Sequence, residues 1–203
     1  MLIIGLTGPS GAGKGAVASL FAKYGIPSID TDAVYHRLLV PPSPCLDELT
    51  ERFGCEILNT DGTLNRKALA ARVFASGHEA DLRDLNRITH RHVLERVRRL
   101  LDDYRAAESP AVLVDAPQLF EEGFSAECVV ILSVLASRES RVARIMKRDG
   151  LDEASALSRI NAQRADDFFR EHSHEIIIND GDVADLEKDV KHLLTKWEVR
   201  HEA

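Results

Sequence analysis

The glycine-rich segment GPSGAGKGAV, at residues 8–17, constrains the fold of this chain more than any other feature. Gly8, Gly13 and Lys14 match the pattern G-x-x-x-x-G-K. An apolar run that favours a β-strand, LIIGL, precedes the segment, and a stretch with helical periodicity, AVASLFAKYG, follows it. In such a unit, successive backbone N–H groups and the helix N-terminus surround a phosphate, and the lysine reaches the β- and γ-phosphate oxygens. The segment therefore predicts a strand, a nucleotide-binding loop and a helix.

Apolar runs and helical patterns alternate along the rest of the chain. Runs typical of strands occur at 26–30, 111–117, 128–134 and 176–180. Helical patterns occur at 138–148, 152–164 and 183–197. The segment 34–107 is also helical, and it is too long for a simple crossover between two strands. We therefore expect a single α/β domain over 1–203 of the P-loop NTP hydrolase-like type, with about five parallel strands flanked by helices and an inserted helical subdomain at 34–107.

Several polar residues follow or end these predicted strands. The glycine-rich loop, Asp32, Asp115 and Asn179 all occupy such positions. Ligands of open parallel sheets bind at the carboxyl ends of the strands. We therefore expect these residues to converge on one rim of the sheet.

Charge and composition exclude several classes of protein. The formal net charge of −7 argues against a broad nucleic-acid-binding surface, which would need many Lys and Arg residues. The N-terminal run MLIIGLTG lacks a preceding basic segment and is far too short for a signal core or a membrane span. The three cysteines are widely spaced and suggest neither disulfides nor a zinc site. We expect a cytoplasmic protein that binds neither nucleic acid nor membrane; the oligomeric state stays open.

The loop departs from the usual pattern directly after its lysine. Most such loops have a Ser or Thr there that ligates Mg²⁺, whereas this chain has Gly15 and Ala16. The GAGKG sequence resembles the loop of adenylate kinases, in which a glycine also follows the lysine but a threonine comes next. Mg²⁺ usually keeps several waters, so a water can take the place of the missing hydroxyl. The change lowers the expected activity but not the expected nucleotide binding.

The whole chain resembles the dephospho-CoA kinase family. The blocks that carry the resemblance are SIDTDAVYH, FGCEILNTDGTLNRKALAARVF, LRDLNRITH, VLVDAPQLFEEGF, RIMKRDGL, SRINAQ and IIIND, in this order. The resemblance implies an ATP- and Mg²⁺-dependent enzyme that phosphorylates the ribose 3′-hydroxyl of dephospho-CoA, giving coenzyme A and ADP. It also implies that dephospho-CoA lies between the core and the helical insertion.

The resemblance assigns catalytic roles to Lys14, Asp32 and Arg148. Asp32 would accept the proton of the attacking hydroxyl, because phosphoryl transfer needs a carboxylate beside its nucleophile. An Asp after a strand is also a common helix N-cap, so Asp32 could serve there instead, while Asp30 is expected to be structural. The ATP-binding residues would be Ser10, Gly11, Ala12, Gly13, Lys14, Gly15, Ala16 and Asn179, the last of them at the adenine.

Further residues are assigned to the substrate. Besides Asp32, they are His36, Arg66, His90, Asp115, Pro117, Leu119, Phe120 and Glu121. Asp115 would contact the substrate or, through water, Mg²⁺; it could equally cap a loop. The segment after it could be an ordinary hydrophobic turn. Each histidine could be a packing or surface residue rather than a ligand.

Arginines cluster in the segment 138–168, which we expect to form a lid. Arg141, Arg144 and Arg148 share one helical face and could close over a triphosphate. The resemblance selects Arg148 as the arginine that neutralises transition-state charge, and it places Arg141 where the family often has glutamine. The alternative is a solvated face paired with neighbouring carboxylates.

Two other functions remain open from the sequence. A nucleoside or nucleotide monophosphate kinase would share the fold class and the GAGKG loop. A nucleotide- or CoA-binding regulatory protein with weak or no turnover would explain Gly15 and Ala16.

Overall fold

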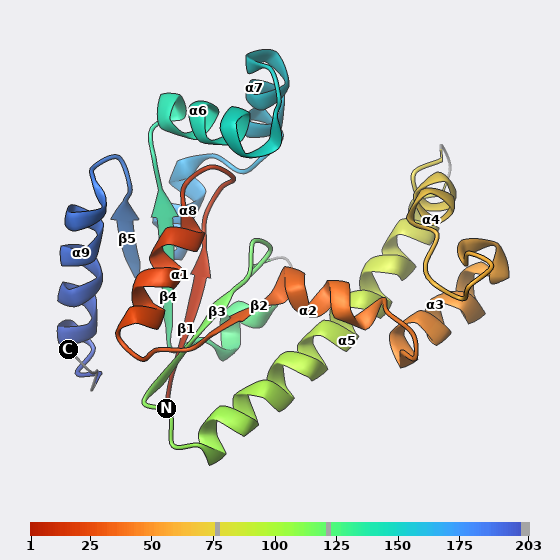
Figure 1. The fold of residues 1–203 in the computed structure, drawn as a ribbon, viewed down its shortest axis with the longest axis horizontal. Coiled ribbons are helices and arrows are strands. Elements are labelled where there is room, and N and C mark those ends of the chain that lie inside the picture. The colour runs from red at the N-terminus through yellow and green to blue at the C-terminus, as the bar shows by residue number, and fades with distance from the viewer. Residues whose placement is uncertain (76–77, 121–122, 200–203) are drawn as a thin grey trace. The chain divides into compact units, whose positions relative to one another are not determined.

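The computed structural model describes residues 1–75, 78–120 and 123–199 (Figure 1). The chain forms two compact units, one made of Met1–Ile29 and Tyr104–Ala203 and the other of Asp30–Asp103. The strands are β1 (Leu2–Thr7), β2 (Ser28–Asp30), β3 (Ala111–Asp115), β4 (Val130–Leu135) and β5 (Glu175–Ile178). The helices are α1 (Lys14–Lys23), α2 (Thr31–Leu38), α3 (Pro44–Phe53), α4 (Arg66–Val73), α5 (Glu79–Ala106), α6 (Arg138–Asp149), α7 (Glu153–Asn161), α8 (Asp166–His172) and α9 (Val183–Lys196). Two 3-10 turns, η1 (Cys55–Ile57) and η2 (Phe124–Glu127), complete the elements.

The five strands form one sheet in the order β2-β3-β1-β4-β5. The central strand β1 pairs in parallel with β3 and β4, and β4 pairs in parallel with β5. The prediction of a parallel sheet of about five strands flanked by helices is confirmed. In this order β1 lies in the middle, so the loop that follows β1 leaves the sheet between its neighbours β3 and β4.

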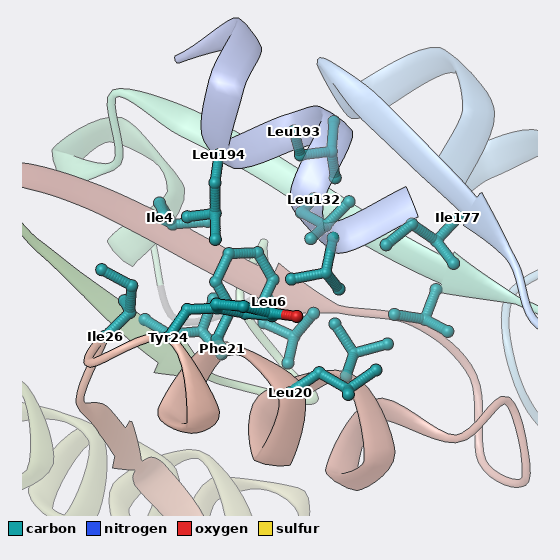
Figure 2. Packing of buried hydrophobic residues seen from close by; sticks show 14 of the residues in the cluster. Ile4, Leu6, Leu20, Phe21, Tyr24, Ile26, Leu132, Ile177, Leu193 and Leu194 are labelled. Atoms are coloured by element: carbon teal, nitrogen blue, oxygen red, sulfur yellow. The ribbon is translucent and has the colours of Figure 1, made fainter. Parts of the chain in front are cut away.

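The main core fills one face of the sheet, beneath α1 and α9. Its side chains come from the strands, such as Ile4 and Leu132, and from the inner faces of the two helices, such as Phe21 and Leu194 (Figure 2). All four of these side chains are fully buried. Strands covered on both faces need apolar side chains in succession, which explains the continuous apolar runs. The core therefore holds β1 and α1 rigidly on either side of the glycine-rich loop.

Helix α8 lies against the opposite face of the sheet. The hydroxyl of Ser133, on β4, forms a 2.7 Å hydrogen bond with the hydroxyl of Ser173, which ends α8. Ser133 alternates along β4 with Leu132 and Val134, which face the main core. Helices α6 and α7 pack on each other through a small apolar cluster.

The unit Asp30–Asp103 is helical and has a core of its own. This core includes Leu49, Phe53, Leu69 and Ile88, from α3, α4 and α5. Asp81 is nearly buried and accepts hydrogen bonds from arginines of α3 and α4 and from His78, and this bonding lowers the pKa of its carboxyl to about 2. The carboxylate therefore stays charged at neutral pH and links three segments of the unit.

Several element boundaries differ from the sequence prediction by a few residues. The strand expected at 111–117 ends at Asp115; the Ala116 amide still donates to the Leu6 carbonyl at 3.0 Å, but Pro117 has no N–H for a sheet bond. The helix expected at 152–164 is α7, which ends at Asn161; its N-cap is Asp152, whose carboxylate accepts from the Ser155 amide. In the part of the chain that the structure describes, no helix combines the length and apolarity needed to span a membrane.

Candidate active site

The loop between β1 and α1 has a backbone that requires glycine at several positions. Gly8, Gly11 and Gly13 have φ angles of 134°, 81° and 99°, a region that side chains rarely adopt. A Cβ added to Gly8 would lie 2.2 Å from the Val134 carbonyl, and one added to Gly13 would lie 2.1 Å from Nδ2 of Asn179. The loop is therefore pressed against the ends of β4 and β5.

Lys14 begins α1 and turns back over the loop. Its Nζ donates a 3.1 Å hydrogen bond to the carbonyl of Gly8, at the start of the loop. The Lys14 and Gly15 amides in the first turn of α1 have no carbonyl one turn earlier in the helix to accept from them, whereas the Ala16 amide donates to the Gly13 carbonyl at 3.0 Å. Together with the positive end of the helix dipole, these amides and the Lys14 ammonium provide the charge pattern that binds an anion.

The two residues after Lys14 lie in the open. Gly15 and Ala16 are exposed, and a Cβ added to Gly15 would meet no described atom within 4 Å. The backbone at Gly15 is helical, so a residue with a side chain also fits there. Lack of space therefore does not explain why the chain has no Ser or Thr after Lys14.

Two arginines of α6 bond to the carbonyl side of the loop. Nε of Arg141 donates to the Ser10 carbonyl at 3.1 Å, and Arg144 donates from one nitrogen to the carbonyls of Gly11 and Ala12 at 3.3 and 3.1 Å. Burial lowers the pKa of the Arg141 guanidinium, although a guanidinium stays protonated at neutral pH. Both guanidinium groups therefore lie on the side of the loop to which these carbonyls point, which we call the side behind the loop.

Asn179, after β5, ties the end of the sheet to the same loop. Its side-chain Nδ2 donates to the Ala12 carbonyl at 2.8 Å, and its own carbonyl accepts from Arg144 at 2.7 Å. Its backbone N–H donates to Leu135 at 2.8 Å. Much of the hydrogen-bonding capacity of Asn179 therefore holds the loop, and its assignment to adenine stays a prediction.

Arg148 lies one helical turn beyond Arg144 and is largely exposed. It forms a bidentate ion pair with Asp149, at 2.8 and 2.9 Å, and it reaches the hydroxyl of Ser10 at 3.3 Å. The bond to Asp149 raises the pKa of Arg148. Asp149 also pairs with Arg159 of α7. The guanidinium thus lies beside the loop, held by a carboxylate that an anionic ligand could displace.

The residues after β3 occupy the neighbouring position in the sheet. Asp115 is in register with Leu6, and its Oδ1 is buried. The Pro117 carbonyl accepts from the hydroxyl of Thr7, the last residue of β1, at 3.5 Å. Asp115 and Pro117 therefore lie beside the start of the loop.

The other residues of this block differ in how accessible they are. Leu119 is fully buried and packs against Gly5 of β1. This is the environment of a core side chain, and it does not support a contact between Leu119 and the substrate. Phe120 is half-buried, with its ring 5.2 Å from that of Phe168 and perpendicular to it. Glu121 lies outside the described residues.

In the helical unit, Asp30 and Asp32 have different surroundings. Asp30 is the N-cap of α2, where its carboxylate accepts from the Ala33 amide at 2.9 Å. Asp32 lies in the first turn and is exposed. The capping role considered for Asp32 therefore belongs to Asp30, which leaves the Asp32 carboxylate available for another role.

His36 and Arg66 lie together in the same unit. Arg66 donates to Nδ1 of His36 at 3.0 Å, and because a guanidinium can only donate, Nδ1 must be the acceptor. His36 is four residues after Asp32 on α2, so the two share a helix face. His90 lies on α5, where burial lowers its pKa and favours the neutral ring. The convergence of the helical unit's residues with the loop stays a prediction.

Sequence reasoning did not identify the contacts behind the loop. It grouped Arg141 and Arg144 with Arg148 as residues that could cover a triphosphate, and it assigned no role to Gln163, which accepts from both Arg141 and the Ser10 amide. Helical spacing places the three arginines on one face, but it cannot tell which of them contact the loop. Gln163 ends the block SRINAQ, but that block does not indicate which residues Gln163 contacts.

Comparison with known proteins places the chain among phosphotransferases. The family model for dephospho-CoA kinase matches residues 2–185. A protein of Corynebacterium efficiens named dephospho-CoA kinase is 37 % identical over 196 residues, which cover 97 % of each chain. Among solved structures, TT1252 of Thermus thermophilus is 34 % identical with a TM-score of 0.78, covering 96 % of this chain and 97 % of its own. The dephospho-CoA kinase of Campylobacter jejuni, at 21 % identity, shares the fold with a TM-score of 0.70 and 96 % coverage of both chains. With a family match over residues 2–185 and a relative 37 % identical over 97 % of its length, this chain belongs to the dephospho-CoA kinase family.

Proposed function

We propose that this protein transfers the γ-phosphoryl group of ATP to the ribose 3′-hydroxyl of dephospho-CoA, which yields coenzyme A and ADP. The observation that carries the proposal is the family match over residues 2–185, which includes Gly8, Gly13 and Lys14 of the loop. We also propose a cytoplasmic location. We further propose that the protein binds neither nucleic acid nor a membrane.

In this proposal the loop binds the triphosphate of ATP. Residues 10–16 surround the triphosphate, with amides such as that of Gly11 donating to phosphate oxygens, and the Lys14 ammonium neutralises charge on the β- and γ-phosphates. Arg148 releases its hydrogen bond to Asp149 and donates instead to the phosphoryl group during transfer. Asn179 lies beside the loop and contacts the adenine. These groups supply positioning and charge neutralisation, which are the main requirements of phosphoryl transfer.

The same proposal assigns further residues of the chain to the acceptor. Asp32 accepts the proton of the 3′-hydroxyl. His36 and Arg66, which are hydrogen-bonded to each other, bind an anionic group of dephospho-CoA, and His90 contacts the same substrate. Pro117 and Phe120 line the substrate site, and Asp115 lies beside them.

The residues of this chain are compatible with Mg²⁺ even without the loop hydroxyl. The described residues form no cluster of three or more His, Cys, Asp or Glu side chains that could hold a metal by themselves, and Mg²⁺ at nucleotides is usually held by phosphates, waters and one or two carboxylates. Asp115, next to the loop, would contribute such a carboxylate through water. When bound, Mg²⁺ would supply positive charge that offsets the negative charge of the phosphate oxygens.

A comparison of acceptors tests the proposed function. ADP release would be measured with ATP and Mg²⁺ in the presence of dephospho-CoA, AMP, CMP or nucleosides. We expect turnover with dephospho-CoA, and phosphate on the 3′-oxygen of the product by phosphorus NMR. Preferential turnover of a monophosphate or a nucleoside would instead assign the chain to that class of kinase, and tight binding of ATP or CoA without ADP release would indicate a regulatory protein.

A substitution after the lysine tests the role of water at the loop. Gly15→Ser adds a hydroxyl where the structure has room for it. Since a water can replace such a ligand at little cost in free energy, we expect the half-saturating Mg²⁺ concentration to change by no more than about tenfold. Gly15→Ala, which adds the carbon without the hydroxyl, is the matched control, and Ala16→Thr tests the next position. If either hydroxyl variant were active where the natural chain shows no turnover, the natural loop would be catalytically dead.

A further inference from the structure

The most unusual charged side chain in the sheet unit is that of Arg141. It is 5 % exposed, whereas arginines are almost never fully buried unless they are paired. Nε donates to the Ser10 carbonyl at 3.1 Å, one terminal nitrogen donates to Oε1 of Gln163 at 3.1 Å, and the other donates to Asp166 at 3.3 Å. The guanidinium therefore joins the loop to the segment between α7 and α8.

Gln163 closes this arrangement into a ring around one loop residue. Its Oε1 accepts from Arg141 and also from the Ser10 amide, at 3.0 Å. Ser10 is thus held on both sides, through its N–H by Gln163 and through its carbonyl by Arg141. Neither contact comes from the loop itself, since Gln163 and Arg141 are 153 and 131 residues away in the chain.

The bond to the Ser10 carbonyl fixes the direction of a different group. In a trans peptide the carbonyl of one residue and the N–H of the next point in opposite directions. Because Arg141 holds the Ser10 carbonyl toward α6, the N–H of Gly11 must point the other way, away from α6. Gly11 has a φ of 81° and lies so close to α6 that an added Cβ would be 2.7 Å from the Arg141 carbonyl. Arg141 therefore holds the peptide that carries one of the loop amides.

We propose that Arg141 and Gln163 act as a clamp that positions the Ser10–Gly11 peptide, so that the Gly11 amide is oriented for a phosphate of ATP before ATP binds. Arg141 is a positioning residue in this proposal, because it contacts the loop carbonyl rather than the nucleotide. The inference rests on the proposed function only in taking ATP as the ligand of the loop. A free loop would have to be ordered on binding, and the clamp removes that cost from the affinity.

Single and double substitutions test the clamp by direct binding of ATP, measured by calorimetry without an acceptor. Arg141→Lys keeps the charge but cannot donate to Ser10, Gln163 and Asp166 at once. Gln163→Leu keeps the approximate size and removes the acceptor. We expect each to weaken ATP binding by about tenfold, as for loss of a charge-assisted hydrogen bond. The double variant should be little weaker than either single variant, because both act on one peptide.

A conservative variant and a control separate positioning from general stability. Gln163→Glu keeps an oxygen that accepts from both Arg141 and Ser10, so we expect it to retain the affinity for ATP. Arg138→Lys lies in the same helix, where Arg138 is exposed and bonds to Asn161, and we expect no change. In turnover assays the KM for ATP should rise while kcat changes by less than about threefold, since the amide binds the phosphate in the ground state as well.

Three outcomes would overturn the clamp. They are unchanged ATP affinity in Arg141→Lys and Gln163→Leu, equal losses in Gln163→Leu and Gln163→Glu, and losses that follow the folded fraction seen by circular dichroism. Absence of phosphate transfer to dephospho-CoA by the natural chain would contradict the proposed function instead, and it would leave the ATP-binding comparison intact.

Discussion

Lys14→Ala is expected to lower kcat/KM by about 10²–10³-fold, with most of the loss in kcat. The Lys14 ammonium lies over the loop, bonded to the Gly8 carbonyl. In the proposed function it is the charge that the loop brings to the β- and γ-phosphates, and its attraction to the phosphoryl group would increase as charge moves to the leaving oxygen. Steady-state assays of ADP release with saturating dephospho-CoA measure the effect.

The same helix supplies the control for this variant. Lys23 lies in the last turn of α1 and pairs at the surface with Glu187, at 2.8 Å. Lys23→Ala removes an equal charge far from the loop along the helix, and we expect kcat/KM to stay within about twofold, because surface ion pairs contribute little. If the two variants lost activity equally, or if Lys14→Ala kept more than a third of the natural kcat/KM, the loop could not be the phosphate site.

Asp32→Asn is expected to lower kcat by about 10²–10⁴-fold, while ATP affinity stays unchanged. The amide keeps the size of the carboxylate but cannot take the proton of the 3′-hydroxyl. Asp32 lies in the first turn of α2 without acting as its cap, so the variant should fold normally. Rapid-quench measurement of a single turnover isolates the chemical step, and calorimetry with ATP checks binding.

Asp30→Asn is a stringent control because it changes the neighbouring carboxylate in the same way. Asp30 caps α2, and asparagine caps helices about as well as aspartate. We therefore expect nearly natural activity and thermal stability. If Asp32→Asn lowered kcat by less than about threefold, Asp32 would not be the proton acceptor, and Asp115→Asn would be the next substitution to measure.

The pattern around the loop was sufficient to predict the fold. A strand, G-x-x-x-x-G-K and a helix can meet in few geometries, and the apolar runs of β1, β3 and β4 required a sheet covered on both faces. The residues at which strands end were predicted less accurately, because the last hydrogen bond of a strand depends on where the neighbouring strand ends. The pattern could not assign the helix cap, since Asp30 and Asp32 both lie at the junction of a predicted strand and a helix.

The sequence by itself determined the parallel sheet, the phosphate-binding loop and the family, because these depend on local periodicity, backbone freedom at glycine and the order of short motifs. Only the tertiary structure decided that Leu119 is core and that Arg141 lies behind the loop. Burial and hydrogen-bond partners are set by segments more than a hundred residues apart that fold against one another, and no local spacing encodes which of several similar side chains will meet.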